Sequence, residues 1–120
     1  MEVRAKRIYE PTEPADGYRL LVDRLWPRGI SKNSTALDDW MKDVAPSTEL
    51  RRWFRHKAER WPEFKRRYGE ELDTRQDLIS EILALARAGP VTLIYSAKDT
   101  EHNQAVALAA YLAAKSQEPD

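Results

Sequence analysis

The stretch Val91-Thr-Leu-Ile-Tyr95 is a short, almost continuous apolar run, and it decides the fold class of this chain. Such a run is typical of a central strand that is covered on both faces. A broad apolar helical face precedes it from Arg75, and Gly89 with Pro90 ends that helix. An Ala-rich helix is predicted after it, over residues 103–115. A buried strand between two helices predicts an α/β domain.

Two further strands are predicted near the N-terminus. Residues 3–9 mix β-branched, aromatic and basic side chains in partial alternation, which favours a strand with one solvated face near a sheet edge. Residues 18–25 form the second strand, centred on Leu20-Leu21-Val22. The segment between them is rich in turn formers and is short for a helical crossover. Whether these two strands run antiparallel therefore stays open.

The middle of the chain is predicted to be helical. Residues 36–44 form a short helix with Ser34 or Thr35 as its cap, and Ser47 caps a second helix. Pro62 suits the first turn of a third helix. We therefore expect one small domain over residues 1–120, with a frayed tail over 116–120. Its mostly parallel or mixed sheet has three or more strands and is flanked by about five helices.

Composition excludes several classes of function. The chain has 120 residues with 20 Lys plus Arg against 20 Asp plus Glu, which argues against bulk electrostatic capture of nucleic acid or of a membrane. The absence of Cys excludes disulfides, thiolate nucleophiles and iron–sulfur clusters. His56 and His102 lie far apart, so we expect no metal and no cofactor. No apolar stretch approaches the roughly 20 residues of a membrane span, and a charged N-terminus predicts a cytoplasmic protein.

Polar loops follow two of the predicted strands. In open α/β sheets, ligands bind at the carboxyl ends of strands, where helix N-termini favour anions. If the two strands are parallel neighbours, their loops converge on a site for a small anionic or phosphorylated ligand, with hydrolase-like or transferase-like chemistry. Proton transfer is assigned to Asp23, Asp99 and His102. The candidate ligand-binding residues are Arg24, Arg28, Lys32, Ser96, Lys98 and Asn103.

Each of these side chains also has a structural interpretation. Asp23 and Arg24 can form an ion pair at a strand end, Asp99 can cap the last helix, and His102 can simply be solvated. A third interpretation makes the same loops a subunit interface with Trp26 as its anchor.

A basic run between Arg51 and Arg67 is the second candidate for function. Four aromatic residues are interleaved with it, so it is a possible nucleic-acid interface with phosphate contacts and stacking platforms. The aromatic residues also fall at helical spacing, which favours the alternative that they belong to the core. In that case the cations form a solvated face paired with Glu70, Glu71 and Asp73.

The block Leu21-Val-Asp-Arg-Leu-Trp-Pro-Arg-Gly-Ile-Ser-Lys32, with Leu93-Ile-Tyr-Ser-Ala-Lys-Asp99, resembles the YeaO-like proteins. These form a bacterial and archaeal family classed as a domain of unknown function, and the resemblance runs from about Val3 to Leu112. More distant members look as if they carry Cys-His-Arg where this chain has His102-Asn103-Gln104. The resemblance therefore implies the location of the site, without thiol or rhodanese-like sulfur chemistry.

Overall fold

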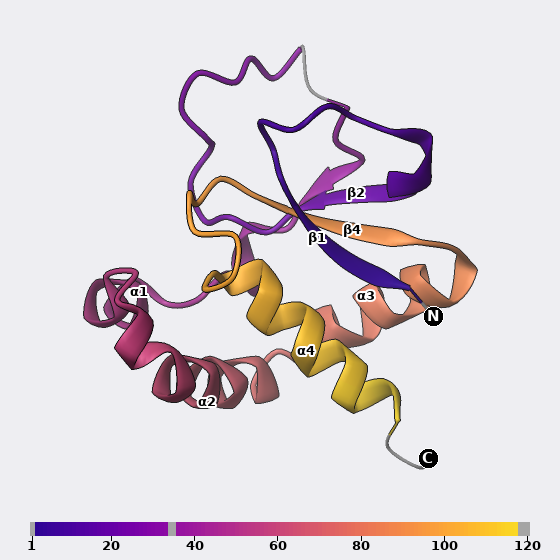
Figure 1. Cartoon of the computed structure of the whole chain (residues 1–120). Coiled ribbons are helices and arrows are strands. Elements are labelled where there is room, and N and C mark those ends of the chain that lie inside the picture. Colours follow the sequence, from indigo (N-terminus) through magenta and orange to yellow (C-terminus); the bar gives the residue numbers. More distant parts are fainter. Residues whose placement is uncertain (1, 34–35, 118–120) are drawn as a thin grey trace.

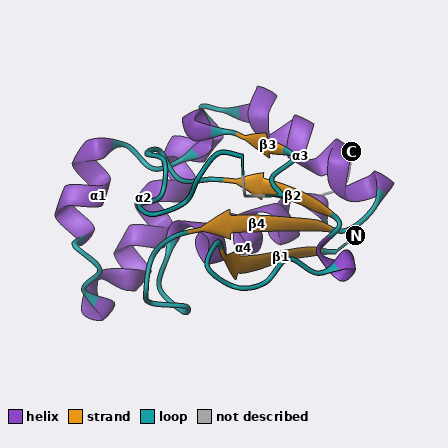
Figure 2. Ribbon diagram, turned by 90° about the horizontal axis from the view of Figure 1, so that it is seen from above, coloured by secondary structure: helices purple, strands orange, loops and turns teal. Residues whose placement is uncertain are grey.

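Strand β4 (Val91–Tyr95) is the centre of a parallel sheet in this computed structural model, which describes residues 2–33 and 36–117. β1 (Val3–Arg7) pairs with one edge of β4 and β2 (Tyr18–Leu21) with the other, and β3 (Asp39–Trp40) follows β2. All three pairings are parallel, in the order β1-β4-β2-β3 (Figure 2). The predicted central strand is confirmed, because all five residues of β4 are buried. The edge position of β1 is confirmed as well.

The helices lie on one face of this sheet, and long loops cover the other face (Figure 1). They are α1 (Thr48–Phe54), α2 (Trp61–Asp73), α3 (Gln76–Ala88) and α4 (Gln104–Ser116). Short 3-10 turns occupy Pro14–Asp16, Lys42–Val44 and Ala58–Arg60. None of the helices in residues 2–33 and 36–117 combines the length and the apolar character needed to span a bilayer.

The strand side chains divide between two apolar clusters. Successive residues of a strand point to opposite faces, so Leu20 and Leu93 join the main core with the helices. Leu21 and Ile94 join Ile8 in a smaller cluster on the opposite face. Because both faces of β4 are covered, its apolar run has no polar alternation.

Side-chain caps fix the starts of two helices. Ser47 accepts a hydrogen bond from the Leu50 N–H through its Oγ, at 3.1 Å, and so confirms the predicted cap of α1. The Glu71 carboxylate holds Ser47 in turn, at 2.8 Å from its N and 2.6 Å from its Oγ. At α4, Asn103 accepts from the Val106 N–H at 2.9 Å.

The predicted helix over residues 36–44 is wrong. Asp39 and Trp40 form β3 instead, and the Met41 N–H donates to Leu21 O at 2.9 Å. Pairing with the open edge of β2 satisfies the backbone here, and alternation sends Trp40 to the smaller cluster and Met41 to the main core. The described residues therefore contain four α-helices rather than about five. The proposed caps Ser34 and Thr35 lie outside the described residues.

The chain ends and strand ends also differ from expectation. β1 stops at Arg7, short of the predicted residue 9, because its partner β4 ends opposite it at Tyr95. β2 likewise ends at Leu21 rather than at residue 25. α4 continues to Ser116, where the sequence predicts the start of a frayed tail, and residues 118–120 of that tail lie outside the described residues.

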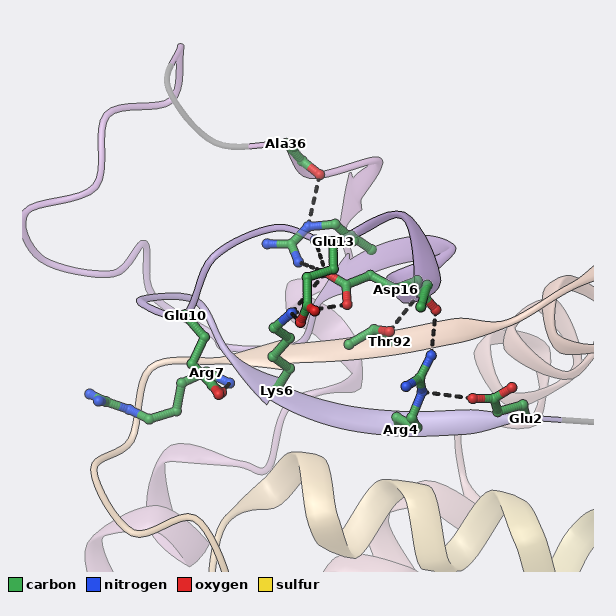
Figure 3. Close-up of polar contacts among 11 residues, drawn as sticks. Glu2, Arg4, Lys6, Arg7, Glu10, Glu13, Asp16, Ala36 and Thr92 are labelled. Atoms are coloured by element: carbon green, nitrogen blue, oxygen red, sulfur yellow. Dashed lines mark hydrogen bonds and ion pairs between the residues drawn. The ribbon is translucent and has the colours of Figure 1, made fainter.

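A buried ionic network joins the first loop to the sheet on the face away from α4 (Figure 3). The Asp16 carboxylate lies 2.5 Å from an Arg19 guanidinium nitrogen and 3.0 Å from Lys6 Nζ. The Arg19 Nε donates to Ala36 O at 3.0 Å, and Thr92 Oγ1 donates to Asp16 O at 2.6 Å. Asp16 and Arg19 are both almost fully buried, at 4% and 3% exposure. The network therefore ties the loop before β2 and the loop before β3 to strands β1, β2 and β4.

Candidate functional site

The two predicted polar loops meet at the carboxyl ends of β2 and β4. These strands are parallel neighbours, and both point toward α1 (Figure 2). The Asp23 carboxylate accepts hydrogen bonds from Ser96, at 3.1 Å from its N and 2.6 Å from its Oγ. The Gln104 side-chain amide also donates to Asp23. The expected convergence of the loops is therefore confirmed, with Asp23 joining both loops to the start of α4.

Asp23 is an unusual carboxyl because it lies in the protein interior with only 8% of its surface exposed. Burial raises the pKa of Asp23 above its ordinary value, although the hydrogen bonds from Ser96 and Gln104 and the charge of Arg51 act in the opposite direction. Its main-chain oxygen accepts from Trp40 Nε1 at 2.7 Å, which fixes the turn after β2.

A cavity of about 340 Å³ opens beside Asp23. The loop after β2, helix α1 with its following turn, helix α2 and the start of α4 all contribute to its wall. The apolar part of the wall includes Trp26, Pro27, Phe54 and Phe64. The polar part includes Asp23, Arg24, Arg28, Arg51, His56 and Ser96.

Three guanidinium groups line this cavity, and each has a different environment. Arg24 is held by main-chain oxygens, since it donates to Ala45 O at 3.1 Å and Pro46 O at 3.3 Å. Arg28 is exposed at the rim. The Nε of Arg51 is buried and has no hydrogen-bond partner among residues 2–33 and 36–117. The cavity wall thus carries three guanidinium groups and one carboxyl.

Comparisons with known proteins place the chain in a family. A family model described as "Inactive DUF488-N3 subclade" matches residues 2–120. The chain belongs to the DUF488-N3i family. It is 46% identical to the uncharacterised protein YeaO of Escherichia coli K12 over 112 residues, which cover 93% of this chain and 97% of YeaO. The resemblance to YeaO-like proteins is therefore confirmed.

Mycobacterial relatives are similar over nearly as much of the chain. Uncharacterised proteins of Mycobacterium bovis and of Mycobacterium tuberculosis H37Rv are each 44% identical over 110 residues, covering 92% of both chains. No solved structure matches the chain.

Local hydrogen bonds of Asp99 hold together the turn after β4 of this DUF488-N3i protein. Asp99 accepts from the N–H groups of Glu101 at 2.8 Å and His102 at 3.0 Å, and it lies 2.9 Å from His102 Nδ1. These hydrogen bonds, led by the one from Glu101, hold the pKa of Asp99 below its usual value. The His102 and Trp61 rings pack in a T-shaped arrangement, with ring centres 5.4 Å apart. Neither Asp99 nor His102 is among the residues that line the cavity.

The remaining predicted site residues take different positions. Lys98 is exposed and outside the cavity wall, and Lys32 lies over the rings of Trp26 and Trp40, at 5.5 Å and 5.9 Å. Asn103 does reach the wall, but its side chain caps α4 and donates to Asp99 O at 2.9 Å. The structure therefore brings Asp23, Arg24, Arg28, Ser96 and Asn103 together at the cavity.

Sequence reasoning missed three polar side chains of the DUF488-N3i cavity, namely Arg51, His56 and Gln104. Arg51 follows buried Leu50 and lies three residues before buried Phe54, so it stands at the border of an apolar helical stripe. That spacing was a usable signal. His56 offered none, because its position depends on the left-handed backbone at Arg55 and His56, with φ of 48° and 54°.

The basic run gives a mixed outcome. Phe54 and Phe64 are buried and stacked, with ring centres 4.3 Å apart, which confirms that they are core residues. Arg66 and Arg67 pair with Glu63 at 2.8 Å and 2.9 Å. Hydrogen bonds from Arg66, which has the larger effect, and from Arg67 lower the pKa of Glu63 to about 2.

Three acidic residues were predicted to pair with this run. Among the described residues only Glu70 does so, because it forms an ion pair with Arg66. The pairings proposed for Glu71 and Asp73 are wrong. Glu71 binds Ser47, and Asp73 accepts from Tyr111 Oη at 2.6 Å. The nucleic-acid interface itself stays a prediction.

The role of Trp26 as a subunit anchor also stays a prediction. Its ring packs edge-on against Trp40, with centres 5.4 Å apart, and its Nε1 donates to Ile30 O at 2.7 Å. Trp26 thus contributes to the smaller apolar cluster of its own chain.

Proposed function

We propose that this protein is a binding module for a small anion, held in the cavity at the carboxyl ends of β2 and β4. The supporting observation is that Arg24, Arg28 and Arg51 line one cavity with a single carboxyl, and that the Arg51 Nε is buried without a partner among the described residues. A guanidinium donates in a planar fork that suits carboxylate and phosphate oxygens. The terminal nitrogens of such guanidinium groups can donate to an anion in the cavity.

The size and lining of the cavity support a small ligand. A cavity of about 340 Å³ is at the lower end of small-molecule sites. Phe54 and Phe64 supply apolar surface to the wall, and α4 begins beside the cavity with Gln104 in its wall. The first N–H groups of a helix favour anions. A phosphate or carboxylate group carried on a small body suits this combination.

The same contacts favour binding over hydrolysis or group transfer. General acid–base catalysis needs a side chain within hydrogen-bond reach of the substrate. Asp99 and His102, two of the three residues predicted for proton transfer, bond to each other in a turn outside the cavity wall. The description of the family as inactive agrees with a binding role.

Calorimetric titration with inorganic phosphate and small organic carboxylates tests this proposal. We expect saturable binding to the wild type, weakened about tenfold or more in Arg51→Gln, because a hydrogen bond to a charged group contributes about 1.5–3 kcal/mol. Arg28→Gln at the rim should weaken binding less, since its side chain is more solvated.

Arg87→Gln is the matched control. Arg87 is exposed in the last turn of α3, just before β4 begins, and so lies at the opposite end of the sheet. The Arg87→Gln protein should bind the anion as tightly as the wild type does. Absence of binding to any anion, or an equal loss in Arg87→Gln and Arg51→Gln, would contradict the proposal. Unfolding temperatures of the variants show whether each is folded.

A further inference from the structure

Asp23 is the one carboxylic acid among the described residues that line the cavity. It lines the space that the anion is proposed to occupy, as do Arg24, Arg28 and Arg51. A carboxylate at this position repels any anion that offers it only oxygen lone pairs. Its presence in a cavity lined by guanidinium groups therefore restricts the anions that can bind.

The protein fills most of the hydrogen-bonding capacity of Asp23. A carboxylate has about four acceptor positions on its two oxygens. Ser96 occupies two of them on Oδ2, through its N–H at 3.1 Å and its O–H at 2.6 Å. The Gln104 amide occupies one on Oδ1. One acceptor position on Oδ1 remains, and a ligand atom can accept no hydrogen bond there and can use the position only if it carries a proton.

We propose that Asp23 determines specificity, so that the site takes an oxyanion that carries an O–H and rejects one that does not. The O–H of the ligand donates to the remaining acceptor position on Oδ1, while the other oxygens accept from Arg28 and Arg51. Hydrogen phosphate is the simplest such ligand. Sulfate has the same shape and charge near neutral pH but no proton, so its oxygens meet the carboxylate without a hydrogen bond. This inference rests on the proposed function.

The wild-type protein tests the inference directly, by calorimetric titration with inorganic phosphate and with sulfate near neutral pH. We expect phosphate to bind about tenfold or more tightly than sulfate, the factor that one hydrogen bond to a charged group supplies. Glycerol phosphate is titrated in parallel. Tighter binding of this ester than of phosphate would assign the site to a phosphorylated small molecule, and weaker binding would assign it to free phosphate.

Asp23→Asn tests the residue itself. The amide oxygen of Asn can accept from Ser96, and its NH₂ can donate to a turned Gln104 amide, so the substitution keeps three hydrogen bonds and removes the charge. We expect sulfate binding to strengthen until the two anions differ by less than about threefold. Asp99→Asn is the matched control, since Asp99 lies outside the cavity wall, and it should keep the wild-type ratio.

The outcomes separate the two proposals. If neither anion binds the wild type, the proposed function fails and this inference fails with it. If both bind with equal affinity and Arg51→Gln weakens both, the anion site stands and the role of Asp23 is overturned. Equal preference for phosphate in Asp23→Asn and the wild type also overturns it. The wild-type ratio decides the matter alone if Asp23→Asn does not fold.

Discussion

Asp16→Asn should lower the free energy of unfolding by about 3–5 kcal/mol, which is the usual cost of removing one partner from a buried ion pair. The substitution keeps the shape of the side chain but leaves Arg19, which is 3% exposed, with an uncompensated charge. It also removes the charge that Lys6 meets at 3.0 Å. Urea unfolding followed by circular dichroism measures the effect.

Glu13→Gln is the control for this network. Glu13 contacts the same Lys6 at 2.8 Å, but its side chain is 66% exposed, so its loss should cost less than about 1 kcal/mol. An Asp16→Asn protein as stable as Glu13→Gln would show that burial does not strengthen the Asp16 contacts.

Acid should remove the contribution of Asp16 in the wild type. Burial raises the pKa of Asp16, but the hydrogen bonds from Glu13 N–H, Lys6 and Arg19 outweigh it, and the net pKa lies below the ordinary value of 3.8. A lowered carboxyl pKa stabilises the folded state above the unfolded pKa, and this contribution is lost as the pH falls through the folded pKa. We expect the difference between wild type and Asp16→Asn to shrink below about pH 4.

Gly17→Ala should destabilise the protein by about 2–4 kcal/mol through strain and overlap. Gly17 has φ of +64°, and a Cβ added there would lie 2.9 Å from both the carbonyl carbon and the Cβ of Pro90 and still closer to its oxygen. Pro90 O accepts from the Tyr18 N–H at 2.9 Å, which begins the pairing of β2 with β4. The added methyl group would therefore push apart the two strands that position the cavity.

Gly29→Ala is the matched substitution. Gly29 also has a positive φ, of +76°, but a Cβ built there has no atom within 4 Å. Gly29→Ala should lower the free energy of unfolding only by the penalty for a left-handed backbone, about 1 kcal/mol. Thermal unfolding of the two variants side by side measures the difference, and equal losses would contradict the role of the Pro90 contact.

The parts of the fold that burial patterns determine could be predicted from the sequence. The run Val91–Tyr95 has no polar alternation, so its central place follows from hydrophobic burial alone. Ser47 before α1 gave a local signal that the structure confirms. The helix predicted over 36–44 is wrong because Trp40 and Met41 fit a helical stripe as well as strand alternation. Only pairing with the open edge of β2 decides between helix and strand.

The candidate site was predictable in location but not in composition. Parallel pairing of β2 and β4 brings Asp23 and Ser96 together. The sequence predicts this contact on the condition that the two strands are neighbours. Arg51 and His56 reach the cavity from α1 and its following turn. The spacing of Arg51 shows that it borders an apolar helical stripe, but it does not show where that helix sits against the strand ends. The position of Lys98 in the loop after β4 predicts a place in the site, but Lys98 lies outside the cavity wall.

A residue-resolved titration with phosphate, followed by backbone amide NMR shifts, tests the central claim most directly. We predict that the shifted amides cluster at Asp23, Arg51, Ser96 and Gln104, which line one cavity from four separate parts of the chain. In Arg51→Gln the same amides should shift only at higher phosphate concentration. Shifts that gather instead along the exposed face of α2 at Arg66 and Arg67, or no shifts at all, would contradict an anion site at the strand ends.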